Sequence, residues 1–216
     1  MFELFNPQGE LRINRGNLPH WFQPGATYFV TFRTEDSIPK EVSDLWHRKR
    51  LDWLQRHGID SKQPGWMERL EQQAESLLRE YHDTFSREYL DSLDRGYGAC
   101  VLRERGCAEI VAKSLKHFDN DRYYLGDFVV MPNHVHLLVG LLGTTDIQKQ
   151  CYSWKKFSAG ELNKRLNLAG RFWQEESFDH LVRSADNFER LQIYIANNGP
   201  KAGLNPNEYL LWRRDQ

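Results

Sequence analysis

Two histidines within residues 129–140 are the residues of this sequence best suited to chemistry. His134 and His136 are one residue apart in the apolar, β-branched run Val-Val-Met-Pro-Asn-His-Val-His-Leu-Leu-Val-Gly. Because successive side chains of a strand point to opposite faces, both imidazoles project together while Val135 can face a core. Two imidazoles on one rigid strand form half of a divalent-metal site. The same pair is also typical of the solvated face of an antiparallel strand, so other residues must decide between the two interpretations.

A helix near the end of the chain can supply the missing groups. Tyr194 and Asn198 are four residues apart and therefore lie on the same helical face. If that face covers the sheet beside the histidines, Asn198 can offer its carbonyl oxygen to the metal and Tyr194 can hold its phenol over the same ion. The following Gly199-Pro200 leaves open whether Asn197 or Asn198 is the ligand. Oxygen ligands favour Mg²⁺ or Mn²⁺, although two imidazoles equally suit Zn²⁺ or Ni²⁺.

A tyrosine beside such a metal is suited to phosphodiester transesterification. A phenol is a poor nucleophile at its ordinary pKa of ~10, but a nearby cation favours the phenolate and the metal polarises the phosphate. Tyr194 would attack phosphorus, and the covalent phosphotyrosine would keep the bond energy until a hydroxyl reseals the strand. Tyr152 is the rival nucleophile, although a packing role explains it more simply.

The elements that must position these residues form an alternating pattern. Residues 26–34 alternate in polarity, which predicts a half-buried strand after Pro24-Gly25. A helix is expected near 106–118. Residues 123–131 and 134–139 are expected to form a β-hairpin around Pro132-Asn133.

Two further helices follow, and an additional helical segment interrupts the pattern. Asp146 is the expected N-cap of a helix that extends to about residue 166. Ser184 or Asp186 is the expected N-cap of a second helix, which begins at Ala185. Gly199-Pro200 should end this helix at Asn197 or Asn198. Residues 40–93 are charged and helical, without evident chemistry. A narrow apolar stripe before Gly58 comprises Val42, Leu45, Trp46, Trp53 and Leu54. A second stripe follows from about Trp66 through Leu70, Leu77, Leu78 and Tyr81. These elements predict an α+β fold, with helices on one face of an antiparallel sheet and an inserted helical segment.

The bulk composition restricts the class of protein. With 216 residues, 40% hydrophobic, the chain can bury a core and is not a disordered protein. The net charge of −1 argues mildly against a protein that coats nucleic acid through bulk charge. Three cysteines without a C-x-x-C pair favour reduced thiols over a cysteine-based zinc site. With neither a membrane-length apolar stretch nor a signal-peptide pattern, we expect a soluble cytoplasmic protein.

Four segments, taken in order, resemble the single-tyrosine HUH nucleases, specifically the REP-associated tyrosine transposases of the IS200-like family. The histidine strand, residues 124–139, resembles the family's histidine–hydrophobe–histidine strand. Residues 154–163, Trp-Lys-Lys-Phe-Ser-Ala-Gly-Glu-Leu-Asn, are similar to its basic helix. Residues 172–183 resemble its Trp-Gln-x-x-Ser-aromatic-Asp-His segment. Residues 193–198, Ile-Tyr-Ile-Ala-Asn-Asn, followed by 201–204, Lys-Ala-Gly-Leu, are similar to its catalytic helix and exit.

The resemblance implies a specific activity and fold. It implies a ferredoxin-like sheet and a cytoplasmic bacterial protein that cleaves single-stranded DNA next to REP-type hairpins through a 5′-phosphotyrosine. By position, Tyr194 becomes the nucleophile and His134, His136 and Asn198 the ligands of Mg²⁺ or Mn²⁺. We expect a single domain over residues 1–216 with the helical insertion at about 40–93, as either a monomer or a homodimer. Candidate contacts to DNA are Lys155, Lys156, His180, Arg183 and Lys201.

Two other functions remain open from the sequence. A domesticated hairpin-DNA-binding regulator could keep the fold without turnover, which the altered exit after Asn198 and the low net charge would suit. A zinc hydrolase could use the same H-x-H strand, but the sequence offers no obvious acidic third ligand or general base at helical spacing.

Overall fold

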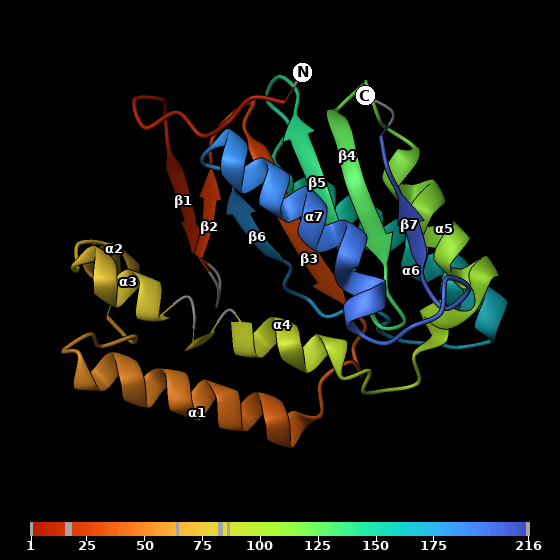
Figure 1. Ribbon diagram of the computed structural model, residues 1–216, viewed down its shortest axis with the longest axis horizontal. Coiled ribbons are helices and arrows are strands. Elements are labelled where there is room, and N and C mark those ends of the chain that lie inside the picture. The colour runs from red at the N-terminus through yellow and green to blue at the C-terminus, as the bar shows by residue number, and fades with distance from the viewer. Residues whose placement is uncertain (1, 16–18, 64, 82–83, 86, 215–216) are drawn as a thin grey trace. The chain divides into compact units, whose positions relative to one another are not determined.

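The computed structural model consists of two compact units, which we describe separately (Figure 1). One unit combines Met1–Ser37 with Ala99–Gln216, and the other is Ile38–Gly98. The structure describes residues 2–15, 19–63, 65–81, 84–85 and 87–214. Within these ranges, no helix has the length and apolar character needed to cross a membrane.

The larger unit is built on a five-stranded antiparallel sheet in the order β6-β3-β5-β4-β7. Its strands are β3 (Thr27–Arg33), β4 (Tyr123–Val130), β5 (His134–Leu141), β6 (Phe178–Leu181) and β7 (Leu210–Trp212). Helix α5 (Arg105–Lys116) follows β3 along the chain, and α6 (Ile147–Leu166) connects β5 to β6. Strands β3 to β6 therefore follow the β-α-β-β-α-β order of the ferredoxin-like fold, with β7 added at the β4 edge. The predicted antiparallel α+β sheet is confirmed.

The predicted strands and hairpin are present, and the short strands were not foreseen. Strand β3 matches the alternation over 26–34, and Met131 N donates to His134 O at 2.8 Å to close the turn between β4 and β5. Strands β6 and β7 were not predicted from the sequence. Strands β1 (Arg12–Arg15) and β2 (Pro19–Phe22), which pair in a separate two-stranded sheet, were not predicted either. Three or four residues are too few to show a period, so their pairing depends on neighbouring strands.

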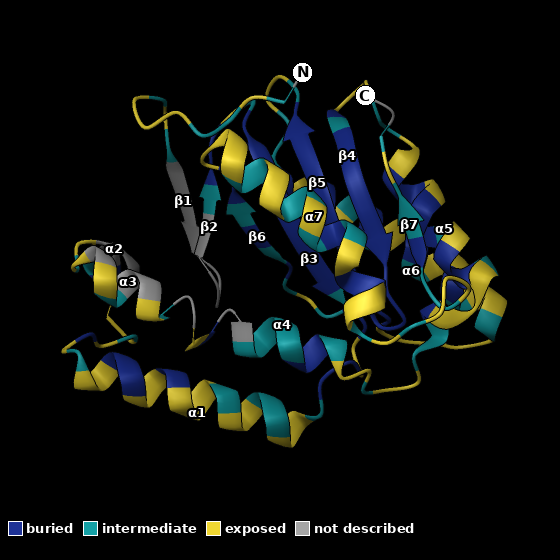
Figure 2. Ribbon diagram, viewed as in Figure 1, coloured by how far each residue is buried: buried dark blue, intermediate teal, exposed yellow. Residues whose placement is uncertain are grey.

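Alternation along the strands gives the sheet two apolar faces. Tyr28 and Val30 illustrate the first face, whose core is shared with α5 and α6. Phe29 and Leu138 belong to the second face, which packs against Ile195 of α7 (Ala185–Lys201). Figure 1 shows α7 in front of the sheet and α6 behind it, and Figure 2 shows β3, β4 and β5 buried between them. The two ferredoxin-like helices thus share one face, whereas α7 covers the opposite face. The expectation of helices on one face only is therefore wrong for α7.

The helix caps follow the predicted chemistry at the N-termini but not at the last C-terminus. Asp146 Oδ1 accepts from Lys149 N at 3.0 Å, and Ser184 caps α7. The expected end of α7 at Gly199-Pro200 is wrong, because the helix continues to Lys201. Gly203, with φ of 70°, ends it instead, and its neighbour Leu204 donates to Gly199 O at 3.1 Å. A proline this close to the end removes one helical hydrogen bond without stopping the last turn.

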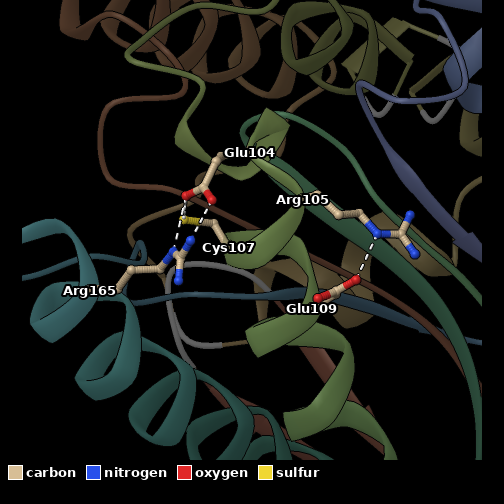
Figure 3. Close-up of polar contacts among 5 residues, drawn as sticks. All are labelled: Glu104, Arg105, Cys107, Glu109 and Arg165. Carbon is tan, nitrogen blue, oxygen red and sulfur yellow. Dashed lines mark hydrogen bonds and ion pairs between the residues drawn. The ribbon is translucent and has the colours of Figure 1, made fainter.

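A charged cluster joins α6 to the start of α5 (Figure 3). Arg165 donates to the Glu104 carboxylate through Nε at 3.1 Å and through Nη2 at 2.5 Å, and Cys107 Sγ donates to it at 3.0 Å. These donors lower the pKa of Glu104 to about 2. Burial, followed by Glu104, raises the pKa of the Cys107 thiol to about 11. The cysteine is therefore a neutral thiol in a structural contact.

The smaller unit, Ile38–Gly98, contains four helices within its described residues. They are α1 (Lys40–Arg56), α2 (Trp66–Glu71), α3 (Glu75–Tyr81) and α4 (Arg87–Asp94). Trp53 and Leu54 of the predicted stripe are buried in its core, whereas Leu45 is 47% exposed. The buried Arg50 guanidinium lies 5.6 Å and 5.2 Å from the ring centroids of Trp46 and Trp66. Aromatic side chains thus stabilise this small core.

Candidate active site

His134 and His136 lie at the start of β5, and both are fully buried. Their rings are 4.6 Å apart at 71°. The Nδ1 atom of His136 lies 2.7 Å from Oγ1 of Thr31, its partner on β3, and Nδ1 of His134 lies 2.7 Å from Oδ1 of Asn133. Because Nδ1 of each ring is engaged, Nε2 is the nitrogen suited to ligate a metal. Such partners orient the rings of metal-binding histidines.

Burial keeps both imidazoles in the form that binds metals. It lowers the pKa of His134 to about 3, an effect that Asn198 partly opposes. Burial also holds the pKa of His136 well below its usual value, and the charges of His134 and Lys201 add to that shift. Both rings are therefore neutral at pH 7, as metal ligation requires.

Helix α7 brings Tyr194 and Asn198 to these rings. Tyr194 Oη lies 3.4 Å from His136 Nε2. Asn198 has no solvent exposure and acts on the pKa of His134, but Asn197 is exposed. Apart from its contact with His134, the side-chain amide of Asn198 has no hydrogen-bond partner among the described residues. Leaving a buried amide unsatisfied costs about 1–3 kcal/mol. The amide of Asn198 is therefore suited to bind a further group, such as a metal ion.

The donor set fits a divalent ion with a carbonyl oxygen as its third protein ligand. No cluster of three or more His, Cys, Asp or Glu side chains occurs in the described ranges, so an all-acidic or thiolate site is not formed there. His134, His136 and Asn198 together offer two neutral nitrogens and one oxygen. Mixed nitrogen and oxygen donors of this kind suit Mn²⁺ and, with water completing the shell, Mg²⁺.

Phe29 forms an aromatic floor that sequence reasoning missed. Its ring stacks on His136 with centroids 5.5 Å apart at 18°, and it contacts Tyr194 edge-on at 5.9 Å. It also lies 5.6 Å from the ring of His180, its partner on β6. The alternation of residues 27–33 placed Phe29 and Thr31 on one face. Only the pairing of β3 with β5 shows that this is the histidine face.

The predicted DNA contacts divide between the two faces of the sheet. His180 lies on the histidine face through its pairing with Phe29. Lys201 is exposed, and its charge acts on His136. Arg183 is exposed beside aromatic side chains, with its guanidinium 5.7 Å from the ring of Phe5.

The residues of α6 lie on the other side. Lys155 donates through Nζ to Gln174 O at 3.2 Å and to Glu175 O at 2.6 Å, and burial lowers its pKa. Lys156 Nζ lies 5.8 Å from the ring centroid of Tyr152, which is 63% exposed. The structure therefore brings Tyr194 to the histidines and leaves Tyr152 on a helix of the opposite face.

Comparison with known proteins identifies the segment that contains this site. Residues 101–198, a little under half of the chain, match the family model described as transposase IS200 like. This segment is similar to the IS200-like transposases. A solved structure described as the REP-associated tyrosine transposase bound to a REP hairpin is also similar, with 14% identity and a TM-score of 0.46. That similarity covers 91% of this chain and 90% of the other. No curated protein matches the chain.

Proposed function

We propose that this protein is a metal-dependent, single-tyrosine DNA endonuclease and strand transferase that acts on single-stranded DNA next to REP-type hairpins. The observation that carries the proposal is the distance of 3.4 Å between Tyr194 Oη and His136 Nε2. A phenol is thereby held against the buried, neutral imidazole of His136, whose ring lies 4.6 Å from that of His134. The single-stranded substrate and the hairpin come from the resemblance of the sequence to REP-associated tyrosine transposases.

His134, His136 and Asn198 would hold Mg²⁺ or Mn²⁺. When bound, such an ion supplies Lewis-acid polarisation of a phosphate oxygen. Thr31 and Asn133 each engage Nδ1 of one imidazole, which leaves Nε2 as the nitrogen that would bind such an ion.

Tyr194 is the nucleophile of the proposed reaction. Its phenol proton passes to water, and Oη forms a bond to phosphorus. The bond from phosphorus to the 3′-oxygen breaks, and that oxygen takes up a proton from water. The products are a 5′-phosphotyrosine and a free 3′-hydroxyl, and the reverse attack by a 3′-hydroxyl rejoins a strand. Phe29 contacts both the imidazole of His136 and the phenol of Tyr194, and so helps to hold these two rings in position.

The whole chain would act as one catalytic domain with the helical segment at about 40–93 inserted into it. His180, Arg183 and Lys201 are candidates for phosphate contacts near the site. Lys155 and Lys156 would contact DNA only where it also reaches the α6 side of the sheet.

The proposal is tested by trapping the covalent product. A single-stranded oligonucleotide containing a hairpin is incubated with the protein and Mn²⁺, and a covalent band is sought in a denaturing gel. Tyr194→Phe should abolish the adduct while hairpin binding persists. Tyr152→Phe is the matched control and should retain the adduct. An adduct that survives in Tyr194→Phe would contradict the assignment.

The ligand set is tested in the same assay. Chelation of the metal, His136→Ala and Asn198→Ala should each suppress the adduct, whereas Asn197→Ala should not. If the unaltered protein binds hairpin DNA without any adduct in Mg²⁺ or Mn²⁺, the hairpin-binding regulator becomes the better description.

A further inference from the structure

A groove between α5 and β7 lies outside the histidine site. Its volume is about 570 Å³. One wall is a single face of α5, and the other wall is the edge strand β7. The lining residues used below are Arg105, Glu109, Lys113, Lys116, His117 and Trp212.

The helical wall of the groove is basic. Lys113 and Lys116 are exposed in the last turn of α5, and His117, directly after the helix, is exposed as well. The acidic residue of this wall, Glu109, is paired with Arg105 at 2.9 Å, as Figure 3 shows. In the part of the chain that the structure describes, neither lysine takes part in an ion pair. Their charges therefore remain available to an anionic ligand although the protein as a whole carries a net charge of −1.

The opposite wall holds one of these charges in place. Lys116 Nζ lies 4.9 Å from the ring centroid of Trp212, and the Arg214 guanidinium lies 5.8 Å from it. The indole is also stacked on Phe128 with centroids 5.2 Å apart. Because the ring is already in contact with two cations and a phenyl ring, it is better suited to position the cations than to stack on an unpaired base.

The length and the place of the groove suit a polymer. Arg105 and Lys116 are eleven residues apart on α5, about 16 Å along the helix axis at ~1.5 Å per residue. That length spans several phosphates of a DNA strand, spaced ~3.4 Å along a duplex axis. The segment just before α5 adjoins the β4–β5 turn, because Leu102 N donates to Pro132 O at 3.1 Å, two residues before His134.

We propose that the α5–β7 groove binds the phosphate backbone of duplex DNA, the stem of a hairpin, through Lys113 and Lys116. This inference rests on the proposed function for its substrate and names a second contact surface of the same protein. Since the groove offers cations and no open aromatic face, binding there should depend on salt and be insensitive to stem sequence.

The test compares two double variants that remove the same charge. Lys113→Gln with Lys116→Gln alters the groove while keeping long side chains, and Lys149→Gln with Lys164→Gln removes two exposed lysines of α6. Binding of hairpins with two different stem sequences is measured by fluorescence anisotropy between 50 and 200 mM salt. Thermal unfolding checks that every variant is folded.

The groove variant should lose about 1.8 from the slope of log affinity against log salt, at ~0.9 per phosphate contact. The ratio of the affinity of the unaltered protein to that of the groove variant should therefore fall about tenfold from 50 to 200 mM salt. The fall should be equal for both stems. The α6 variant should keep the original slope. Equal slopes in the groove variant and the unaltered protein would overturn the inference, as would equal losses in the two double variants.

A parallel measurement separates this inference from the proposed function. The unaltered protein and the groove variant are given a single-stranded oligonucleotide without a stem, and the covalent adduct is quantified at saturating DNA. Adduct formation by both proteins, with a lower salt slope on hairpins for the variant, supports both proposals. No adduct with any substrate, but a lower slope, would refute the cleavage proposal and leave the groove as a DNA-binding surface.

Discussion

Gly199 allows the sharpest test of how α7 is held over the histidine face. It is buried next to Asn198, and an added Cβ would lie 2.4 Å, 2.5 Å and 2.6 Å from three carbons of the Tyr209 ring. Ordinary carbon contacts lie at 3.4–4 Å, so the ring or the helix must move by about 1 Å. Such overpacking costs about 1–3 kcal/mol. A helical alanine gains about 1 kcal/mol over glycine, which offsets only part of that cost.

Gly199→Ala should therefore lower the free energy of unfolding by about 1 kcal/mol, midway between these opposing effects. In the Tyr209→Ala background the overlap is gone, so Gly199→Ala should raise the free energy of unfolding by ~0.5–1 kcal/mol. The coupling between the two sites should thus be close to 2 kcal/mol, measured by chemical denaturation of the four proteins.

The same variants test whether this packing positions the site. Gly199→Ala should reduce adduct formation at a temperature where the protein is fully folded, because any shift of α7 moves Asn198. The double variant Gly199→Ala with Tyr209→Ala should recover part of the lost adduct formation. Equal stabilisation by Gly199→Ala in both backgrounds would refute the reasoning from the overlap.

Three further predictions concern contacts around the site and the sheet edge. The lowered pKa of Glu104 means that its contribution to stability is present above pH 4.5 and is lost as pH falls towards about 2, so thermal unfolding of Glu104→Gln should vary less over this range. Thr31→Val removes the partner of His136 Nδ1 and should weaken Mn²⁺ binding about 10–100-fold in a calorimetric titration. Asp127→Ala removes the buried acceptor of Arg213 Nε and Arg214 N, and should speed hydrogen exchange of the β7 amides.

The features that were predicted from the sequence are those governed by neighbours along the chain. Period-two alternation identified the strand 26–34 and the face shared by His134 and His136. Asp146 and Ser184 correctly predicted where α6 and α7 begin, because an N-cap hydrogen bond joins residues only three positions apart.

Other features depend on partners that lie far away in the sequence. Strand β6 is recognisable only beside β3, and α7 runs past Pro200 to Lys201, where the αL conformation of Gly203 ends it. The chain pattern likewise could not separate Asn197 from Asn198. Their exposure differs because α7 presents one of them to the sheet.

The sequence by itself thus determined the chemical groups, two imidazoles on one strand face and a phenol and an amide one helical turn apart. Only the tertiary structure decided that α7 covers that same face, while α6 carries Lys155 and Tyr152 to the opposite one. The physical reason is that local spacing sets which side chains of an element share a direction. Which faces meet depends on burying the apolar surfaces of distant elements together.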